Sequence, residues 1–211
     1  MAGSRSERLL AGAGDALTAS ARVRLVEEAT AGTLDPPSFA RYLLIEEGFV
    51  HTAARILGAA VRHAPGWRAV TGHAASLHGL VTEQSDYFAE VRRDRPVPAE
   101  DAAACLRRAA PLSETALRAA EQGYPAIVTS LFAAEHLYAT WCARAVDVPA
   151  ARPDAVQEWI ELHARPPFTD QVAFLRAEVD ALGGDVSDGD VHHWFTAMLH
   201  AEDRFHDAVY A

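Results

Sequence analysis

Three segments of this chain have helical apolar stripes that each contain one glutamate. The stripe of segment 124–146 runs through Val128, Leu131, Glu135, Tyr138 and Cys142. Their spacing of three and four residues places these side chains on one face of a helix. An ionised carboxylate on a buried face is costly unless it is paired, protonated or inside a polar pocket. This pattern therefore requires a helical fold with polar groups in its interior.

The same pattern occurs in two other segments. Near the N-terminus the stripe contains Phe39, Tyr42, Glu46, Phe49, Ala53 and Ile56. Near the C-terminus it contains Phe195, Met198, Glu202, Phe205 and Val209. Three helices with one acid each on the apolar face predict a polar pocket inside a helical bundle.

Composition limits the kinds of partner this protein can have. A length of 211 residues suits one domain with a substantial core, and we expect a single domain over 1–211 with residues 1–7 flexible. The net charge of −10 argues against nucleic acid or an anionic membrane surface as a partner. Only two cysteines, Cys105 and Cys142, are present, which favours a reducing cytoplasm. We expect no signal peptide and no membrane-spanning helix.

Helix signals extend along the whole chain, whereas strand signals are weak. We expect helices over about 8–30, 38–63, 67–93, 99–109, 113–121, 124–147, 154–164, 168–182 and 190–210. Gly32 ends the first of these, and Pro111 separates the two short helices in the middle of the chain. The sequence predicts an all-α domain of seven to nine helices.

Four motifs follow one another in a recognisable order. They are GTLDPPSFARYLLIEEGFVHTAAR at 32–55, YPAIVTSLFAAEHLYATW at 124–141, a segment that begins WIELHARPPFTDQ at Trp159, and FTAMLHAEDRFHDAVY at 195–210. Their order and spacing resemble the TenA/thiaminase II family over nearly the whole chain. The resemblance implies a haem-oxygenase-like helical bundle.

The resemblance also implies site residues. The family's substrate-binding carboxylate falls on Glu46, its neighbouring aromatic on Phe49, a helical tyrosine on Tyr138, the tyrosine of W-I-x-x-Y on His163, and the C-terminal acid on Glu202. These positions come from all four motifs. They imply one internal site.

The family's nucleophilic cysteine falls on Ala134. Cys142 lies two helical turns further along and points well away from that position, so it cannot replace the missing thiol. The chain resembles the branch of the family that lacks the cysteine and has an active-site glutamate instead, here Glu135.

The family's activity is hydrolysis of aminopyrimidines and related thiamin breakdown products in a salvage pathway, and its members form homodimers or homotetramers. A flat aminopyrimidine can be bound by a carboxylate and sandwiched by aromatic rings. The resemblance thus implies a small heteroaromatic substrate, with Glu46, Phe49, His163 and Trp141 in its binding. Glu135 and Glu202 would divide the acid and base work, assisted by Tyr138. No cofactor is expected.

Simpler interpretations of the three acids stay open. Glu46 could reach solvent at a stripe edge, Glu135 could pair with an arginine, and Glu202 could pair with His206 four residues later. In each case the carboxylate would be structural.

Two other functions also stay open. The same fold supports di-iron oxidases, and Glu135, Glu202 and His206 are candidate iron ligands. The oxidase signature needs a histidine seven residues after a glutamate, but Glu90 stands seven after Glu83. The third possibility is a non-catalytic binder of a small molecule.

Overall fold

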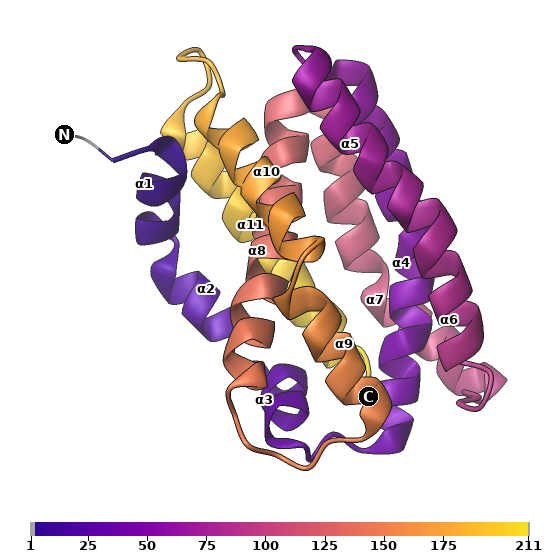
Figure 1. Cartoon of the computed structure of the whole chain (residues 1–211). Helices are drawn as coiled ribbons and strands as arrows, with labels where there is room; N and C mark the ends of the chain where they lie inside the picture. Colours follow the sequence, from indigo (N-terminus) through magenta and orange to yellow (C-terminus); the bar gives the residue numbers. More distant parts are fainter. Residues whose placement is uncertain (1–2, 211) are drawn as a thin grey trace.

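The protein is a bundle of helices (Figure 1). This computed structural model describes residues 3–210, apart from the side chains of Glu83 and Ser85. In that part of the chain every regular element is a helix: α1 Arg5–Gly12, α2 Gly14–Ser20, α3 Arg24–Ala31, α4 Pro36–His63, α5 Trp67–Gly79, a π-helical turn Leu80–Gln84, α6 Ser85–Val91, α7 Ala99–Glu121, α8 Tyr124–Val146, α9 Asp154–Ala164, α10 Phe168–Asp180 and α11 Asp188–Asp207. The all-α prediction is confirmed. Two predicted helices, 8–30 and 67–93, are subdivided, and those expected over 99–109 and 113–121 are joined in α7.

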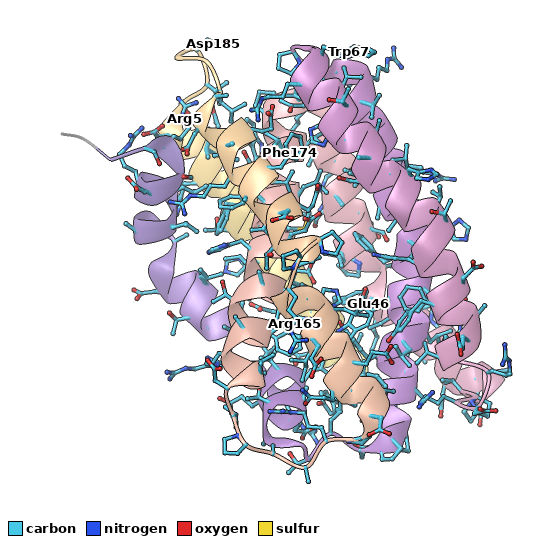
Figure 2. All side chains as sticks on the ribbon, in the orientation of Figure 1. Arg5, Glu46, Trp67, Arg165, Phe174 and Asp185 are labelled. Carbon is cyan, nitrogen blue, oxygen red and sulfur yellow. The ribbon has the colours of Figure 1, made fainter. Side chains whose placement is uncertain are left out.

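The N-terminal segment differs from its prediction. The single helix expected over 8–30 is divided into α1, α2 and α3. Residues 3–7, expected to be flexible, include the Ser4 cap of α1, whose side chain accepts from the amide of Glu7. Arg5 donates to the carbonyls of Leu182 and Val186 in the loop between α10 and α11 (Figure 2). Met1 and Ala2 lie outside the described residues.

The segment before α4 is shaped by local chemistry. Gly32 ends α3 with φ of 74°, a left-handed conformation that glycine adopts without steric cost. Asp35 then caps α4, since its side chain accepts from the amide of Ser38 at 2.9 Å. Pro36 occupies the first helical position, two residues before the predicted start of this helix. These signals start a long helix that carries Glu46.

Pro111 does not separate two helices, as the sequence suggested, but lies inside the single helix α7. A proline in a helix interior removes one backbone hydrogen bond and crowds the preceding turn. Here α7 packs against both α4 and α11, and it buries Cys105, Ala109, Leu112 and Ala116. Burial on two sides outweighs the local cost, so the helix continues.

Replacing Pro111 by alanine is expected to stabilise the protein by about 1 kcal/mol. The new amide can complete the hydrogen bonding of α7, while the greater freedom of the unfolded chain offsets part of the gain. Thermal unfolding checks this prediction. A lower melting temperature would show instead that the proline's rigidity is worth more than the missing bond.

Helix α8 is the centre of the bundle and packs against α7, α9, α10 and α11. It is buried on most sides, as expected for a helix that is apolar around most of its circumference. Phe132 meets Phe195 of α11 with ring centroids 5.8 Å apart. Within residues 3–210, no helix combines the length and the apolar character needed to cross a membrane.

Candidate active site

The polar groups in the bundle interior meet at the hydroxyl of Tyr138. This hydroxyl donates to Glu46 Oε1 at 2.7 Å and lies 2.9 Å from the hydroxyl of Tyr42 and 3.1 Å from His206 Nε2. We call Tyr42, Tyr138 and His206 the tyrosine cluster. Its members come from α4, α8 and α11. The cluster therefore fixes the relative register of three helices.

The hydrogen bonds imply a tautomer for His206. A phenol has one proton, and Tyr138 gives it to Glu46, so Tyr42 and His206 donate to the Tyr138 oxygen. His206 then has its proton on Nε2. Its buried Nδ1, which has no partner among the described residues, is left as an acceptor. Burial also lowers the pKa of His206 to about 4, so the ring is neutral.

The three glutamates of the apolar stripes lie at one level of the bundle. Helices α8 and α11 end near the lower end of the bundle in Figure 1, whereas α4 begins there. Glu135 lies one turn before Tyr138 on α8, and Glu202 lies one turn before His206 on α11. On α4, Glu46 lies one turn after Tyr42. Because α4 runs the opposite way, all three acids stand on the same side of the cluster. Figure 2 shows Glu46 between α4 and α9.

Glu202 is the most constrained of the three. Its side chain is only 3% exposed, and its Oε2 has no partner in the described part of the chain. Burial raises its pKa well above the usual range, and the charges of Glu46 and Asp203 raise it further. The local pair with His206 suggested by the sequence is wrong, because His206 bonds to Tyr138 instead. The surroundings of Glu202 thus favour its protonated form.

Glu46 differs from Glu202 because it has a donor. Burial raises its pKa, while the hydrogen bond from Tyr138 and the nearby polar hydroxyl of Tyr42 lower it. The carboxyl group of Glu46 therefore bonds inside the bundle, although the residue keeps the partial exposure that the solvent-edge interpretation suggested. Glu46 is a carboxylate held in place by phenols and directed into the bundle.

Glu135 faces α10 and forms no ion pair with any described arginine, so the salt-bridge interpretation is wrong. Its Oε2 is buried and unpartnered among residues 3–210. Burial raises its pKa to about 8, and the side chain of Gln171 partly opposes this shift. Gln171 itself accepts from Ser76 Oγ at 2.5 Å. Glu135 therefore belongs to a second polar layer that joins α5, α8 and α10.

Substitution of Glu135 by glutamine is expected to change how stability depends on pH. The carboxyl pKa is about 8 in the folded protein, against 4.5 ordinarily, so stability present below pH 4.5 is lost as the pH rises towards 8. The variant should match the wild type at low pH and exceed it by about 4 kcal/mol at pH 8. Melting temperatures across this range test the prediction. Parallel curves for the two proteins would contradict it.

Aromatic rings surround the carboxyl groups. His163 packs against Trp159, Phe168 and Tyr138 with ring centroids 4.3, 4.7 and 5.4 Å away. Its Nδ1 donates to the carbonyl of Trp159 at 2.7 Å, and burial lowers its pKa to about 4. Its Nε2 is thus left as an acceptor. The ring centroid of Trp141 lies 6.0 Å from that of Tyr138.

Phe49 lies at the edge of this group. It is half-buried and packs on Phe205 with ring centroids 6.1 Å apart. The structure therefore brings Glu46, Tyr138, His163, Trp141 and Glu202 around one region, with Glu135 at the same level and Phe49 beside it.

Several groups of this region give no signal in the sequence. Tyr87 packs on Trp159 with ring centroids 6.0 Å apart. The buried hydroxyl of Tyr87 has no partner among the described residues. Burial is the main cause that raises its pKa to about 12, and the charge of Glu46 also contributes. The ring nitrogens of Trp159 and Trp141 and the amide nitrogen of Gln171 are likewise buried and unpartnered. Tyr87 is on no glutamate-bearing stripe, so its helix alone gave no signal.

The iron-site alternative does not fit these side chains. No three His, Cys, Asp or Glu groups in the described part of the chain come close enough to hold a metal ion. His206 directs Nε2 to Tyr138, not to Glu135 or Glu202. Glu83, named in the same comparison, has a side chain outside the described residues. Cys142 is fully buried with a pKa raised by burial, which does not suit a nucleophile.

Fold and site together define a haem-oxygenase-like helical bundle with an acid and aromatic interior. The sequence matches no protein-family profile and no curated protein. Solved structures do match, and their descriptions name TenA proteins. A TenA homologue from P. horikoshii OT3 has a TM-score of 0.84 at 16% identity and covers 99% of both chains. The predicted resemblance to TenA proteins is thus confirmed for the fold.

Two further structures agree. A TenA family transcription regulator from Silicibacter sp. TM1040 has a TM-score of 0.85 at 17% identity and covers 99% of this chain and 98% of its own. A TenA homologue from Pyrococcus furiosus has a TM-score of 0.79 at 16% identity, with coverage of 98% and 100%. The similarity extends over nearly the whole of each chain, so this protein shares their fold along its length.

Proposed function

We propose that this protein is a TenA-like hydrolase that releases an amine from an aminopyrimidine or a similar small heteroaromatic compound, without a cysteine nucleophile. The observation that supports this most is the set of buried polar atoms without partners around the tyrosine cluster. They are Glu202 Oε2, His206 Nδ1, the Tyr87 hydroxyl and the ring nitrogens of Trp141 and Trp159. Buried polar groups are normally hydrogen-bonded, so a set of this kind favours a polar ligand.

The donors and acceptors suit an aminopyrimidine. Glu46 accepts from an exocyclic amino group, and its geometry is held by Tyr138. A protonated Glu202 donates to a ring nitrogen or to the departing amine. Tyr87, Trp159 and His163 supply aromatic surface for a flat ring.

The carboxyl groups divide the chemistry of hydrolysis. Glu135, with a pKa of about 8, is partly ionised just above neutrality and takes a proton from the attacking water. The water oxygen bonds to the carbon as the carbon–nitrogen bond breaks, and Glu202 gives its proton to the leaving nitrogen. Tyr138 holds Glu46, and through it the substrate, in place.

A further structural neighbour supports this choice of reaction. It is a candidate TenA-like thiaminase from Sulfolobus solfataricus, with a TM-score of 0.70 at 15% identity and coverage of 96% and 95%. That description concerns the Sulfolobus protein. We extend it to this chain because the interior offers acids and aromatic rings in place of the thiol.

The test is a thermal-shift series with aminopyrimidines, followed by an assay of released ammonia or amine and by metal analysis. A melting temperature raised by about 4–8 °C at saturating ligand, with turnover in metal-free protein, would support the proposal. Purification with near-stoichiometric iron, or turnover that requires iron and oxygen, would overturn it. A shift without turnover would reduce the protein to a binder.

A further inference from the structure

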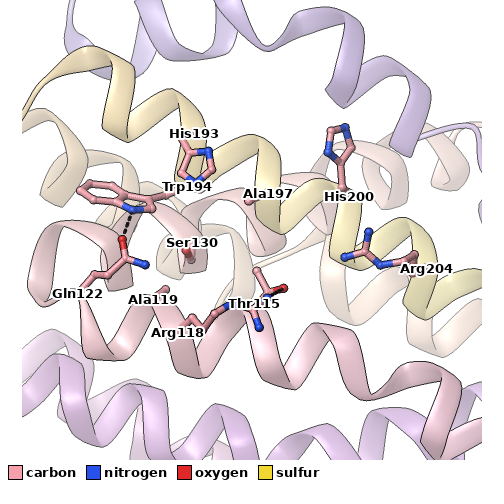
Figure 3. A pocket seen from close by; sticks show the side chains of 10 residues that line it. All are labelled: Thr115, Arg118, Ala119, Gln122, Ser130, His193, Trp194, Ala197, His200 and Arg204. Carbon is pink, nitrogen blue, oxygen red and sulfur yellow. Dashed lines mark hydrogen bonds between the residues drawn. The ribbon is translucent and has the colours of Figure 1, made fainter.

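A hollow lies between α7 and α11, and none of the residues that line it belongs to the interior site (Figure 3). Its volume is about 370 Å³. We call it the α7–α11 groove. Its lining includes Arg118, Ser130, His193, Trp194, His200 and Arg204. It shares no residue with the tyrosine cluster.

The spacing of the lining residues follows the two helices. His193, His200 and Arg204 recur at helical intervals along one face of α11, and Arg118 stands opposite them on α7. Trp194 and Arg204 mark the two ends, ten residues or about 15 Å apart along the helix axis. The hollow is therefore elongated, with an aromatic ring at one end.

The groove concentrates positive charge on an acidic protein. The net charge of the chain is −10, yet two arginines and two histidines line this one hollow. Arg204 has no hydrogen bond or ion pair within the described chain, and Arg118 bonds only to Thr115 Oγ1 at 3.0 Å. Of the nearby acids on α11, Asp203 is half-buried towards Ser20, and Asp207 lies one turn beyond the end of the groove. The guanidinium groups are thus free to bind an anion.

Two residues define the floor and one end of the groove. Ser130 of α8 is 3% exposed and lines the hollow, where its hydroxyl can donate to a bound oxygen. At the aromatic end, the ring nitrogen of Trp194 donates to Gln122 Oε1 at 2.7 Å, which holds the indole in place (Figure 3).

We propose that the α7–α11 groove binds a small phosphomonoester with an aromatic ring, of the type of a nucleoside monophosphate. The ring packs on Trp194, and the phosphate is bound by Arg118 and the hydroxyl of Ser130, with Arg204 at the far end. Arginine suits a phosphate because its planar fork offers paired donors. This site is separate from the proposed hydrolase site, because its lining shares no residue with that site.

Titration calorimetry with AMP, adenosine and inorganic phosphate tests the proposal. AMP should bind more tightly than either part alone. Arg118→Gln and Arg204→Gln should each weaken AMP binding about tenfold, the loss expected for one charge-assisted hydrogen bond. Ala197→Trp, which fills the groove without removing charge, should abolish it. All three variants should keep wild-type amine release, because the altered side chains lie outside the interior.

Arg107→Gln is the matched control. Arg107 is an exposed arginine on α7, the helix that carries Arg118, but it does not line the groove. It should leave AMP binding unchanged. The proposal fails if AMP does not bind at millimolar concentration, if phosphate alone binds as tightly as AMP, or if Arg107→Gln weakens AMP binding as much as Arg118→Gln.

Discussion

Replacing Glu202 by glutamine is expected to lower kcat for amine release by about 10²–10⁴-fold while leaving the protein at least as stable as the wild type. The amide fills the same space but cannot transfer a proton to a leaving nitrogen. The carboxyl pKa is well above 4.5 in the folded protein, so its contribution to stability is lost as the pH rises past that value. The glutamine side chain of the variant does not ionise, so the variant does not lose this stability at neutral pH. Steady-state kinetics and thermal unfolding of the same preparation measure both effects.

Glu178 provides the matched control for this experiment. It is also a glutamate with 3% exposure, but both of its oxygens are occupied, by Arg68 and by the hydroxyl of Tyr124. Glu178→Gln should weaken that ion pair and destabilise the protein by about 1–3 kcal/mol without changing kcat. The two buried acids are thus expected to give opposite results.

This contrast distinguishes a functional acid from a structural one. A folded Glu202→Gln variant with wild-type kcat would remove Glu202 from the proposed mechanism. Lost activity with a large loss of stability would assign it a structural role instead. Groups retained at a cost to stability are expected at functional sites, because selection there acts on chemistry.

Periodicity was sufficient to place the acids inside the protein. The steps of three and four around Glu46 and Glu202 specify a helix face, and the structure buries both faces. The helix bounds of α8 and α9 agree closely with the prediction, because Pro, Gly and Asp mark their ends. Local chemistry governs these features, so one sequence reveals them.

The partners of the acids were not predictable in the same way. That Tyr138 donates to Glu46, and that Gln171 lies beside Glu135, depends on the register between helices far apart in sequence. Tyr87 reaches the site only through the packing of α6 against its neighbours. Pro111 shows the converse, since its local signal for a break was overridden by tertiary burial of α7. Tertiary context decides these cases, and a single-helix pattern does not contain it.

Tyr138→Phe is expected to lower kcat/KM by about 10²-fold, mainly by raising KM. The hydroxyl lowers the pKa of Glu46 by donating to it, so its removal raises that pKa and leaves less carboxylate to bind the substrate. In the pH–activity profile, the limb that reports ionisation of Glu46 should move to higher pH. Tyr42 and His206 also lose an acceptor, so the protein should be destabilised by about 1–3 kcal/mol.

Tyr124→Phe separates the two effects of losing a buried phenol. Tyr124 is buried like Tyr138 but lies outside the proposed site. Its hydroxyl donates to Glu178 Oε2 at 2.7 Å and lies 3.0 Å from His73 Nε2. It should show a similar loss of stability with an unchanged KM and pH profile. If Tyr138→Phe and Tyr124→Phe gave the same KM and the same pH limbs, Tyr138 would be a packing residue and the substrate would not depend on Glu46. A shifted limb in Tyr138→Phe alone would instead connect the tyrosine cluster to binding, because only there does a phenol control the ionisation of an acid that faces the substrate.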